Sequence, residues 1–562
     1  MLPPRPAPHR SQPRVTWPAT IAIALSCVLA ACTRVGTNDA GGAGSSGGRH
    51  SWTVPGTLRI ALPGNINTLN PILSTQQVET VAQALIFDPL VATDSNGRDL
   101  PILAAEVPTL ENGGIGKDGL TITYRLRHNV KWHDGAPFTS RDVQFTVQAI
   151  MNPNTAVATR HGYDDIARVD TPDPYTAVFR LKKPFAPAVH TFFAHSDAPY
   201  MILPAHLLAK YKDLNRIPFN SQPVGTGPFK LKRWLRGDRL EYVPNDGYFL
   251  GKPGLQNISL HLIPDENTII SEMRSHEIDW FFQATPRSYV QLKTIPGVVS
   301  HLVPFNGVDS ILMNTRAEPW TDVRLRKAVV LAVDKAKLVQ DLTFGTAVPA
   351  TEDIPSFMWA YNPNAGTIVR DLPGAKALLE SAGWKPGPDG IRTNGGKRLT
   401  LQLAYRIESV TDRGRGVLLA SMLREAGIDV SLKGYTTALL YGPVGAGGIL
   451  ASGKYQGGLL TWYAGVDPDD SSQLMCDQQP PNGYNWTRYC SAEMDRQQRI
   501  ALTHYDRPTR KAAYAKIQQL LADDVPYVYL WWPRQIESVN EDLHGFRPNG
   551  IIEDWNAWQW SI

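Results

Sequence analysis

Cysteine is scarce in this sequence, with four residues in a chain of 562. That number is too small for a disulfide framework, so a hydrophobic core must carry the stability. An excess of charge of one sign is also missing, because 56 basic residues face 52 acidic ones. Three of the basic residues, Arg5, Arg10 and Arg14, lie in the first 31 positions, which contain no acidic residue. The near-neutral remainder gives no electrostatic reason to expect nucleic acid as a partner.

Motifs for covalent or metal chemistry are also missing. The chain has no H-E-x-x-H, and its histidine pairs are five residues apart, a spacing that does not favour metal ligation from one helix. We therefore expect no catalysis, no metal and no cofactor. One alternative stays open, a secreted hydrolase that uses the acidic loop formed by Asp467, Asp469 and Asp470.

The N-terminus has the organisation of an export signal. An uncharged, largely apolar run of 15 residues, 17–31, follows the three arginines, and it is too short to span a bilayer. It ends in Leu29-Ala30-Ala31-Cys32, which resembles the lipobox of bacterial lipoproteins. We predict a signal peptide over 1–31, lipidation of Cys32 and a flexible Gly/Ser-rich tether over 32–54. A plain secretory signal is the alternative.

From about residue 57 onwards, strand and helix patterns alternate. Apolar and polar residues alternate, as in half-buried strands, at 57–62, 121–126, 176–182, 229–234, 239–243, 258–263 and 399–404. After Asp322, apolar residues recur at helical spacing as far as Phe344, which predicts one helix. Further helices are expected at 373–383, 415–426 and 508–523. Such a mixture predicts an α/β protein.

Several co-linear motifs between residues 57 and 555 carry a resemblance. They are LNP at 69–71, IFDPLV at 86–91, YRLRHNVKWHDGAPFTSRDV at 124–143, PVGTGPF at 223–229, NDGYF at 245–249, ID at 278–279, MNT at 313–315, DVRLRKA at 322–328 and AVD at 332–334. Together they resemble bacterial solute-binding protein family 5, the oligopeptide- and dipeptide-binding lipoproteins of ABC importers.

The resemblance implies a two-lobed fold of the periplasmic-binding-protein type (type II, large peptide-binder class). Lobe I would comprise 55–304, with an extra subdomain at about 90–219, and a return segment at 533–562. Lobe II would comprise 305–532. Two crossings near 304–313 and 527–532 would join the lobes, which close on a solute.

The solute is expected between the lobes, at two loops. The first follows the strand at 57–62 and contains Asn65 and Asn67, whose amides could hold a peptide backbone. The second contains Trp462, Tyr463 and Asp467. In the family's peptide binders, an Asp three residues after the corresponding Trp holds the ligand α-ammonium.

That ammonium-binding position is Gly465 here, so Asp467 is only a possible substitute. Arg406, after the strand at 399–404, is a candidate for a ligand carboxylate, because Arg can bind one in bidentate fashion. A solvated surface Arg is the alternative. For Trp462 and Tyr463 the alternative to ligand stacking is packing at the strand end.

The resemblance further implies a monomeric, extracytoplasmic protein anchored to the membrane, which captures short peptides and delivers them to an ABC permease. The same fold with another solute, such as an oligosaccharide, a nickel chelate or haem, remains an alternative.

Two cysteines remain after processing. Cys476 and Cys490 lie 14 residues apart and flank Pro480-Pro481-Asn482-Gly483, which is typical of a turn. Outside the cytoplasm a disulfide between them would persist, and we predict one. A metal pair or two free thiols are the alternatives.

Overall fold

The computed structural model describes residues 48–194, 196, 198–366 and 369–562. The predicted signal peptide, Cys32 and most of the tether lie outside these residues. Residues from Arg49 to Ile562 form one compact unit. In the described part of the chain, no helix combines the length and the apolar character needed to span a membrane.

Lobe I is built on a sheet of seven described strands, in which the first strand, β1, is central. β1 pairs in parallel with a second strand, so that Thr57 lies opposite Asn257 and Leu62 lies opposite Leu262. The strand order is β11 (Val298–Pro304), β21 (Arg534–Asn540), β10 (Trp280–Phe281), β1 (Thr57–Leu62), β9 (Asn257–Leu262), β8 (Arg239–Pro244) and β7 (Phe229–Leu235). The helices of this lobe are α1 (Gln77–Ala84), α5 (Glu266–Arg274) and α6 (Pro286–Leu292).

A smaller antiparallel sheet belongs to the segment that we name the subdomain, residues 90–219. Thr139 and Asp142 form the capping box of its longest helix, in which each side chain binds the other residue's backbone N–H. The sheet order is β4 (Thr121–Arg125), β6 (Thr176–Leu181) and β5 (Ile166–Asp173), with β2 (Val91–Thr93) and β3 (Asp99–Pro101) paired separately. The helices are α2 (Ser140–Met151), α3 (Ala188–Thr191) and α4 (Ala205–Leu208). One continuous apolar core joins the subdomain to β1, β8 and β9.

Lobe II is built on a sheet of six described strands. Their order is β13 (Val348–Pro349), β20 (Tyr527–Trp532), β12 (Gly307–Met313), β19 (Gly457–Tyr463), β17 (Thr400–Arg406) and β18 (Asp429–Tyr435). A small outlying sheet contains β14 (Lys385–Pro386), β15 (Arg392–Asn394) and β16 (Lys397–Arg398). The helices are α7 (Val323–Ala332), α8 (Lys335–Thr343), α9 (Leu372–Ser381), α10 (Val410–Ala426), α11 (Thr437–Leu440), α12 (Ser471–Leu474), α13 (Ala492–Thr503) and α14 (Arg507–Asp524).

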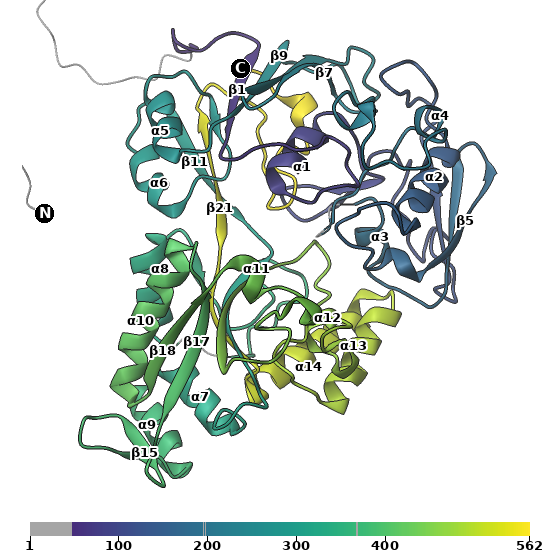
Figure 1. The fold of residues 1–562 in the computed structure, drawn as a ribbon. Coiled ribbons are helices and arrows are strands. Elements are labelled where there is room, and N and C mark those ends of the chain that lie inside the picture. Colours follow the sequence, from purple (N-terminus) through teal and green to yellow (C-terminus); the bar gives the residue numbers. More distant parts are fainter. Residues whose placement is uncertain (1–47, 195, 197, 367–368) are drawn as a thin grey trace, which may run out of the picture. The chain divides into compact units, whose positions relative to one another are not determined.

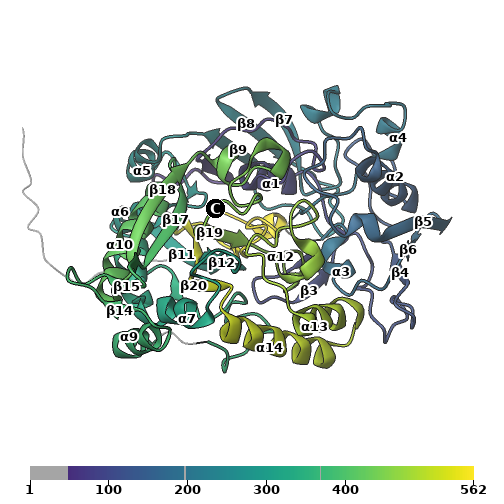
Figure 2. The same cartoon turned by 60° about the horizontal axis from the view of Figure 1, so that its bottom comes forward.

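Helices cover both faces of this second sheet. Side chains of α7, α8, α9 and α10 pack on one face, and side chains of α13 and α14 pack on the other. Adjacent residues of β12 alternate between these two cores, with Ile311 in the first and Leu312 in the second. Figure 2 shows the strands between these two groups of helices. The expected mixed α/β fold is confirmed.

The chain passes between the two sheets twice. β11 belongs to the first sheet and β12 to the second, so the first crossing is Phe305 and Asn306. β20 and β21 are separated only by Pro533, which is the second crossing. Figure 1 shows β21 and β11 at this junction. Both crossings are therefore very short.

One helix prediction differs from the structure. The pattern after Asp322 predicts a single helix as far as Phe344, but two helices, α7 and α8, occupy this stretch. Asp334 lies between them, and its side chain accepts a hydrogen bond from the backbone N–H of Lys337. Asp334 therefore caps a new helix, an effect that apolar spacing alone does not reveal.

Candidate functional site

The loop that follows β19 carries two aromatic candidates in different environments. Tyr463 is 58% exposed, and its ring lies 5.0 Å from that of Phe305 at the first crossing. Trp462 is half-buried, and its ring lies 5.6 Å from that of Tyr484. The Asn306 side chain donates a hydrogen bond to the Gly465 carbonyl, which ties this loop to the crossing.

A small acidic pocket lies beside this loop. It has a volume of about 30 Å³. Its lining includes Asp353, Asp469, Asp470 and Ser310, together with Asn306, Trp462, Ala464, Tyr527 and Tyr529. The carboxyl groups of Asp353 and Asp470 are hydrogen-bonded to each other. Burial raises the pKa of both, and the charge of Asp353 raises the pKa of Asp470 further.

Asp467 is buried and bound by cations of the chain itself. Its two oxygens accept hydrogen bonds of 2.8 and 2.6 Å from the guanidinium of Arg510 in α14. His190 of the subdomain lies 3.6 Å away, and its other ring nitrogen lies 2.9 Å from Asp99. Although burial opposes it, the combined effect of Arg510 and His190 lowers the pKa of Asp467. A ligand ammonium would have to displace one of these two cations.

The subdomain contacts lobe II at a second place. The hydroxyl of Tyr505, between α13 and α14, accepts a hydrogen bond of 3.2 Å from the Phe185 N–H. It donates one of 2.9 Å to the Gly119 carbonyl. The Ala186 N–H donates a 2.6 Å hydrogen bond to the Leu502 carbonyl. These bonds hold the subdomain against lobe II in this structure.

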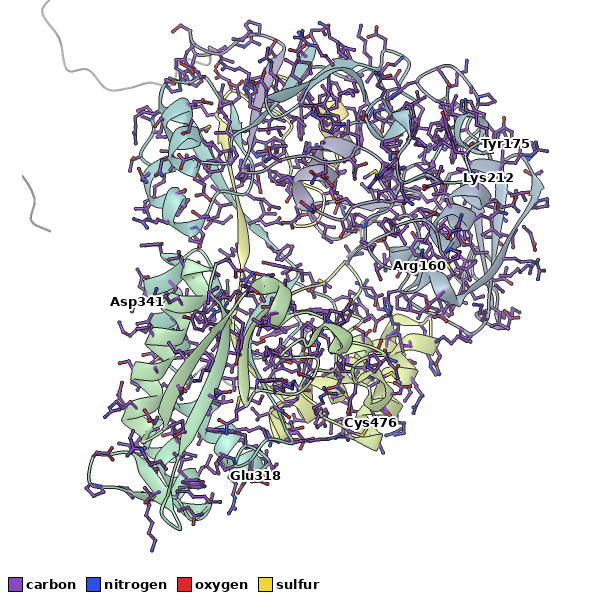
Figure 3. The ribbon with its side chains drawn as sticks, viewed as in Figure 1. Arg160, Tyr175, Lys212, Glu318, Asp341 and Cys476 are labelled. Atoms are coloured by element: carbon purple, nitrogen blue, oxygen red, sulfur yellow. A yellow bond between two sulfur atoms is a disulfide. The ribbon has the colours of Figure 1, made fainter. Side chains whose placement is uncertain are left out.

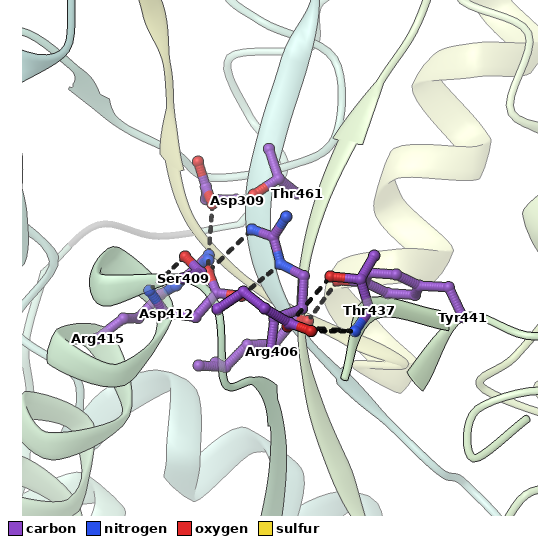
Figure 4. A network of polar contacts seen from close by, with 10 residues as sticks. Asp309, Arg406, Ser409, Asp412, Arg415, Thr437, Tyr441 and Thr461 are labelled. Atoms are coloured by element: carbon purple, nitrogen blue, oxygen red, sulfur yellow. Dashed lines mark hydrogen bonds and ion pairs between the residues drawn. The ribbon is translucent and has the colours of Figure 1, made fainter. Parts of the chain in front are cut away.

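Arg406 belongs to a network of charged side chains in lobe II (Figure 4). Its Nε lies 2.7 Å from Asp412, which also accepts a 2.5 Å hydrogen bond from Arg415. Arg415 reaches onward to Asp309, whose Oδ1 accepts a 2.6 Å hydrogen bond from Thr461. The side chain of Arg406 is 32% exposed, whereas the charged side chains of Asp412 and Arg415 are almost completely buried.

Most backbone N–H groups of the loop after β1 already donate hydrogen bonds within lobe I. The Asn67 N–H donates a 2.5 Å hydrogen bond to Glu79, and the N–H groups of 64 and 68–70 also have acceptors within lobe I. In the part of the chain that the structure describes, the N–H groups of Asn65 and Ile66 have no recorded acceptor. Asn65 and Asn67 are exposed, and among the described residues no hydrogen bond or ion pair links them to the candidates of lobe II.

Cys476 and Cys490 form the expected disulfide, with their Cα atoms 4.7 Å apart. Cys476 lies in lobe II (Figure 3). It follows α12, and its backbone N–H is bound by Asp495 of α13. The bridge therefore closes the segment that follows the acidic loop. Among the described residues, no group of three or more His, Cys, Asp or Glu side chains is arranged to hold a metal ion.

The model of the bacterial extracellular solute-binding proteins, family 5 (middle), matches residues 101–484. This match covers more than half of the chain. The chain belongs to this family. As a family 5 solute-binding protein, it is a transport receptor and not an enzyme.

Several known proteins match the chain over most of its length. Oligopeptide-binding protein AppA of Bacillus subtilis (strain 168) is 24% identical over 552 residues, 96% of this chain and 97% of that protein. Its structure with a nonapeptide has a TM-score of 0.70, covering 90% of this chain and 98% of that one. Protein XP55 of Streptomyces lividans is 28% identical over 84% of this chain and 82% of its own length. NikZ of Campylobacter jejuni, solved with Ni(L-His), is 25% identical, with a TM-score of 0.74 and coverage of 91% and 100%.

Sequence reasoning missed the residues that contact the subdomain, His190, Arg510 and Tyr505. No local pattern marks them, because their partners lie far away in the sequence. Asp353 was missed for the same reason. It follows β13, more than a hundred residues before Asp470, and only the fold brings the two carboxyl groups together.

Proposed function

We propose that this family 5 protein captures short peptides outside the cytoplasm and delivers them to the permease of an ABC transporter. One observation carries the choice of peptides: the match to AppA of Bacillus subtilis, an oligopeptide-binding protein, extends over 96% of this chain. The nonapeptide-bound structure of that relative has the same fold. A match across both lobes supports a shared mode of capture, since the solute is enclosed by both.

Capture needs no covalent step. The lobes rotate about the crossings at Phe305, Asn306 and Pro533, and bound peptide biases them towards the closed state. Contacts from the subdomain to lobe II, made by Tyr505 and His190, stabilise that closed state. The receptor then presents the enclosed peptide to the permease as a monomer.

Side chains at the loop after β19 contact the peptide. Trp462 and Tyr463 stack on its side chains, and the partly exposed side chain of Arg406 binds its carboxylate. Asn65 supplies a backbone N–H from lobe I. Asp467, the candidate for the ligand ammonium, already contacts Arg510 and His190, so a bound ammonium would compete with these two side chains.

The lobe boundaries and the anchor complete the proposal. Lobe I comprises 55–304 and 533–562, and lobe II comprises 305–532. Cys32 carries the lipid that tethers the body to the membrane through the Gly/Ser-rich segment.

The test uses the full chain, purified from membranes in detergent. The protein is equilibrated with a pool of random peptides of two to ten residues, a glycan mixture and nickel–histidine, and the retained molecules are identified by mass spectrometry. We expect intact peptides to be retained. Retention of glycans or of nickel–histidine alone, or cleavage of the peptides, would overturn the proposal.

A further inference from the structure

Lobe II contains a cavity apart from the loops proposed to contact the peptide. Its volume is about 320 Å³, which falls in the range of about 300–1,000 Å³ typical of small-molecule sites. Its described lining residues belong to α7, α8, α9, α14, β20 and the segment after β13, all of them in lobe II. Figure 2 shows α7 and α14 beside β20. Arg406, Trp462 and Tyr463 are not among the lining residues.

The walls of this cavity are mainly apolar. Val330 and Leu331 of α7 and Leu378 of α9 line it, and these aliphatic side chains are only half-buried. The rings of Tyr527 and Tyr529, stacked 5.7 Å apart, form another part of the wall. An apolar ligand would remove the half-buried side chains from water, which is favourable. The walls therefore suit a ligand with an apolar body.

One buried acidic side chain lines the cavity without a partner. Glu352 is 1% exposed, and neither of its carboxyl oxygens has a hydrogen-bond partner among the described residues. The nearby N–H of Asn362 donates its 2.8 Å hydrogen bond to Gln518. Burial and the charge of Asp353 raise the pKa of Glu352 to about 9, although Asn362 lowers it. At neutral pH the Glu352 carboxyl therefore holds a proton, which it can donate in a hydrogen bond.

Two lysines bring positive charge to the same cavity. Lys335, which is 2% exposed, donates a 2.8 Å hydrogen bond to the Ala350 carbonyl. Burial lowers the pKa of Lys335 to about 8, so most of it stays charged at pH 7. Lys327 is half-buried, and among the described residues no carboxylate forms an ion pair with it. With Glu352 protonated, the charge at the cavity is therefore positive.

We propose that this cavity is a second ligand site, which binds a small monocarboxylate with an apolar body. The Glu352 O–H donates a hydrogen bond to the ligand carboxylate, and Lys327 and Lys335 supply the opposite charge. The apolar walls enclose the rest of the ligand. The inference goes beyond peptide capture, because the site belongs to lobe II alone and does not require the two lobes to close.

The test uses octanoate as the probe, with octylammonium and acetate for comparison. Calorimetry measures their binding to the full-length protein in detergent at pH 7, with a titration into the detergent buffer as the blank. We expect octanoate to bind, and acetate to bind far more weakly because it lacks the apolar body. Octylammonium should bind at least tenfold more weakly than octanoate, because it brings a like charge to the lysines. Absence of octanoate binding, or octylammonium binding at least as tight as that of octanoate, would overturn the inference.

Two substitutions at Glu352 separate its hydrogen bond from its volume. Glu352→Gln keeps the shape and an N–H donor, whereas Glu352→Met removes the donor. Both variants should fold, because the Glu352 carboxyl has no hydrogen bond among the described residues to lose. Octanoate should bind to Glu352→Gln about tenfold more tightly than to Glu352→Met, the scale of one hydrogen bond to a charged group. Equal binding by the two variants would overturn the inference.

A third variant blocks the cavity. Ala522→Phe, on α14, places a ring in it, and Ala512→Phe is the matched control, because Ala512 is exposed on the same helix and does not line the cavity. Only Ala522→Phe should lose octanoate binding, and undiminished binding in this variant would overturn the inference.

Saturating peptide should leave octanoate binding to the wild-type protein unchanged, because the two ligands occupy different sites. Displacement of octanoate by peptide would place octanoate between the lobes and overturn the inference, while peptide capture stands. Octanoate binding that Ala522→Phe abolishes, without any retention of peptides, would support the cavity and reject peptides as the solute.

Discussion

His190 of the subdomain and Asp467 of lobe II lie 3.6 Å apart, Nδ1 to Oδ2. The imidazole lies between two carboxylates, since its Nε2 is 2.9 Å from Asp99. Arg510 binds both oxygens of Asp467. When protonated, His190 therefore joins two acidic residues that would otherwise face each other across the contact.

This arrangement predicts a pH dependence with a definite sign. Burial lowers the pKa of His190, but the hydrogen bonds to Asp467 and Asp99 outweigh it and raise that pKa to about 9. A histidine with a raised pKa stabilises the folded form fully below its ordinary value of about 6.5, and loses that effect as the pH rises through about 9. We expect the thermal midpoint to fall over this window.

His190→Gln should flatten the pH dependence between pH 6.5 and 9 and lower the midpoint at pH 6. His128→Gln is the control, because His128 stacks on Tyr175 within the subdomain, with 4.0 Å between the ring centres. Thermal unfolding at half-unit pH steps gives the readout. An unchanged slope in the His190 variant would remove this residue from the pH dependence.

Trp462→Ala should weaken the binding of retained peptides by about 1–3 kcal/mol, the scale of one lost buried aromatic contact. Calorimetry with one peptide from the retained pool measures this change. Trp234→Ala is the control, because Trp234 is also partly buried but lies on β7 of lobe I. Equal affinities for wild type and Trp462→Ala, with the fold intact, would place the peptide elsewhere.

Tyr505→Phe should shift the lobes towards the open state, because it removes the hydrogen bonds to Gly119 and Phe185. One such bond contributes about 0.5–1.5 kcal/mol. Small-angle scattering should show a larger radius of gyration without peptide, and saturating peptide should reduce it. Tyr211→Phe, on the subdomain surface, is the control. If peptide leaves the wild-type radius unchanged, closure is not how the solute is held.

The disulfide should contribute to stability through the unfolded chain. Closing a loop of about 15 residues stabilises a protein by about 3 kcal/mol on the chain-entropy model. Replacing Cys476 and Cys490 with serine should lower the free energy of unfolding by about that amount. Denaturant titration measures it, and thiol counting under denaturing conditions should find two thiols only after reduction. Two free thiols before reduction would contradict the bridge.

Cys32→Ala tests the anchor. We expect the variant to leave the membrane fraction when cells are separated without detergent, while the wild-type protein stays in it. Ser26→Ala, which keeps the lipobox-like segment, is the matched control and should remain with the membranes. A Cys32 variant that still sediments with membranes would place the anchor elsewhere.

Much of the fold follows from local sequence patterns. Alternation at residues 57–62 gives the bounds of β1, and a capping box formed by Thr139 and Asp142 begins α2. These signals are local, because a strand or a helix start is determined by neighbours a few residues apart. The same locality explains the missed break at Asp334, where a polar cap overrides an apolar pattern.

The candidate site was less predictable, because it depends on partners distant in sequence. Asp467 resembles a free carboxylate in the sequence, and only folding brings Arg510 onto it, 43 positions later. Arg406 was proposed from its place after a strand, and the structure adds Asp412, which fixes the direction of its guanidinium. Residue type suggested the chemistry, but tertiary contacts determine which charges remain available.

The two crossings are short, and on each side their flanking strands pair with each other. β11 is antiparallel to β21 in the first sheet, and β12 is antiparallel to β20 in the second. Phe305, Asn306 and Pro533 are the residues between these strands, and the proline ring restricts one of the few free torsions. We therefore expect the two connections to allow the lobes to rotate about a shared axis and to resist the sliding of one lobe past the other. A solute is therefore expected to enter between the lobes along the direction in which they separate.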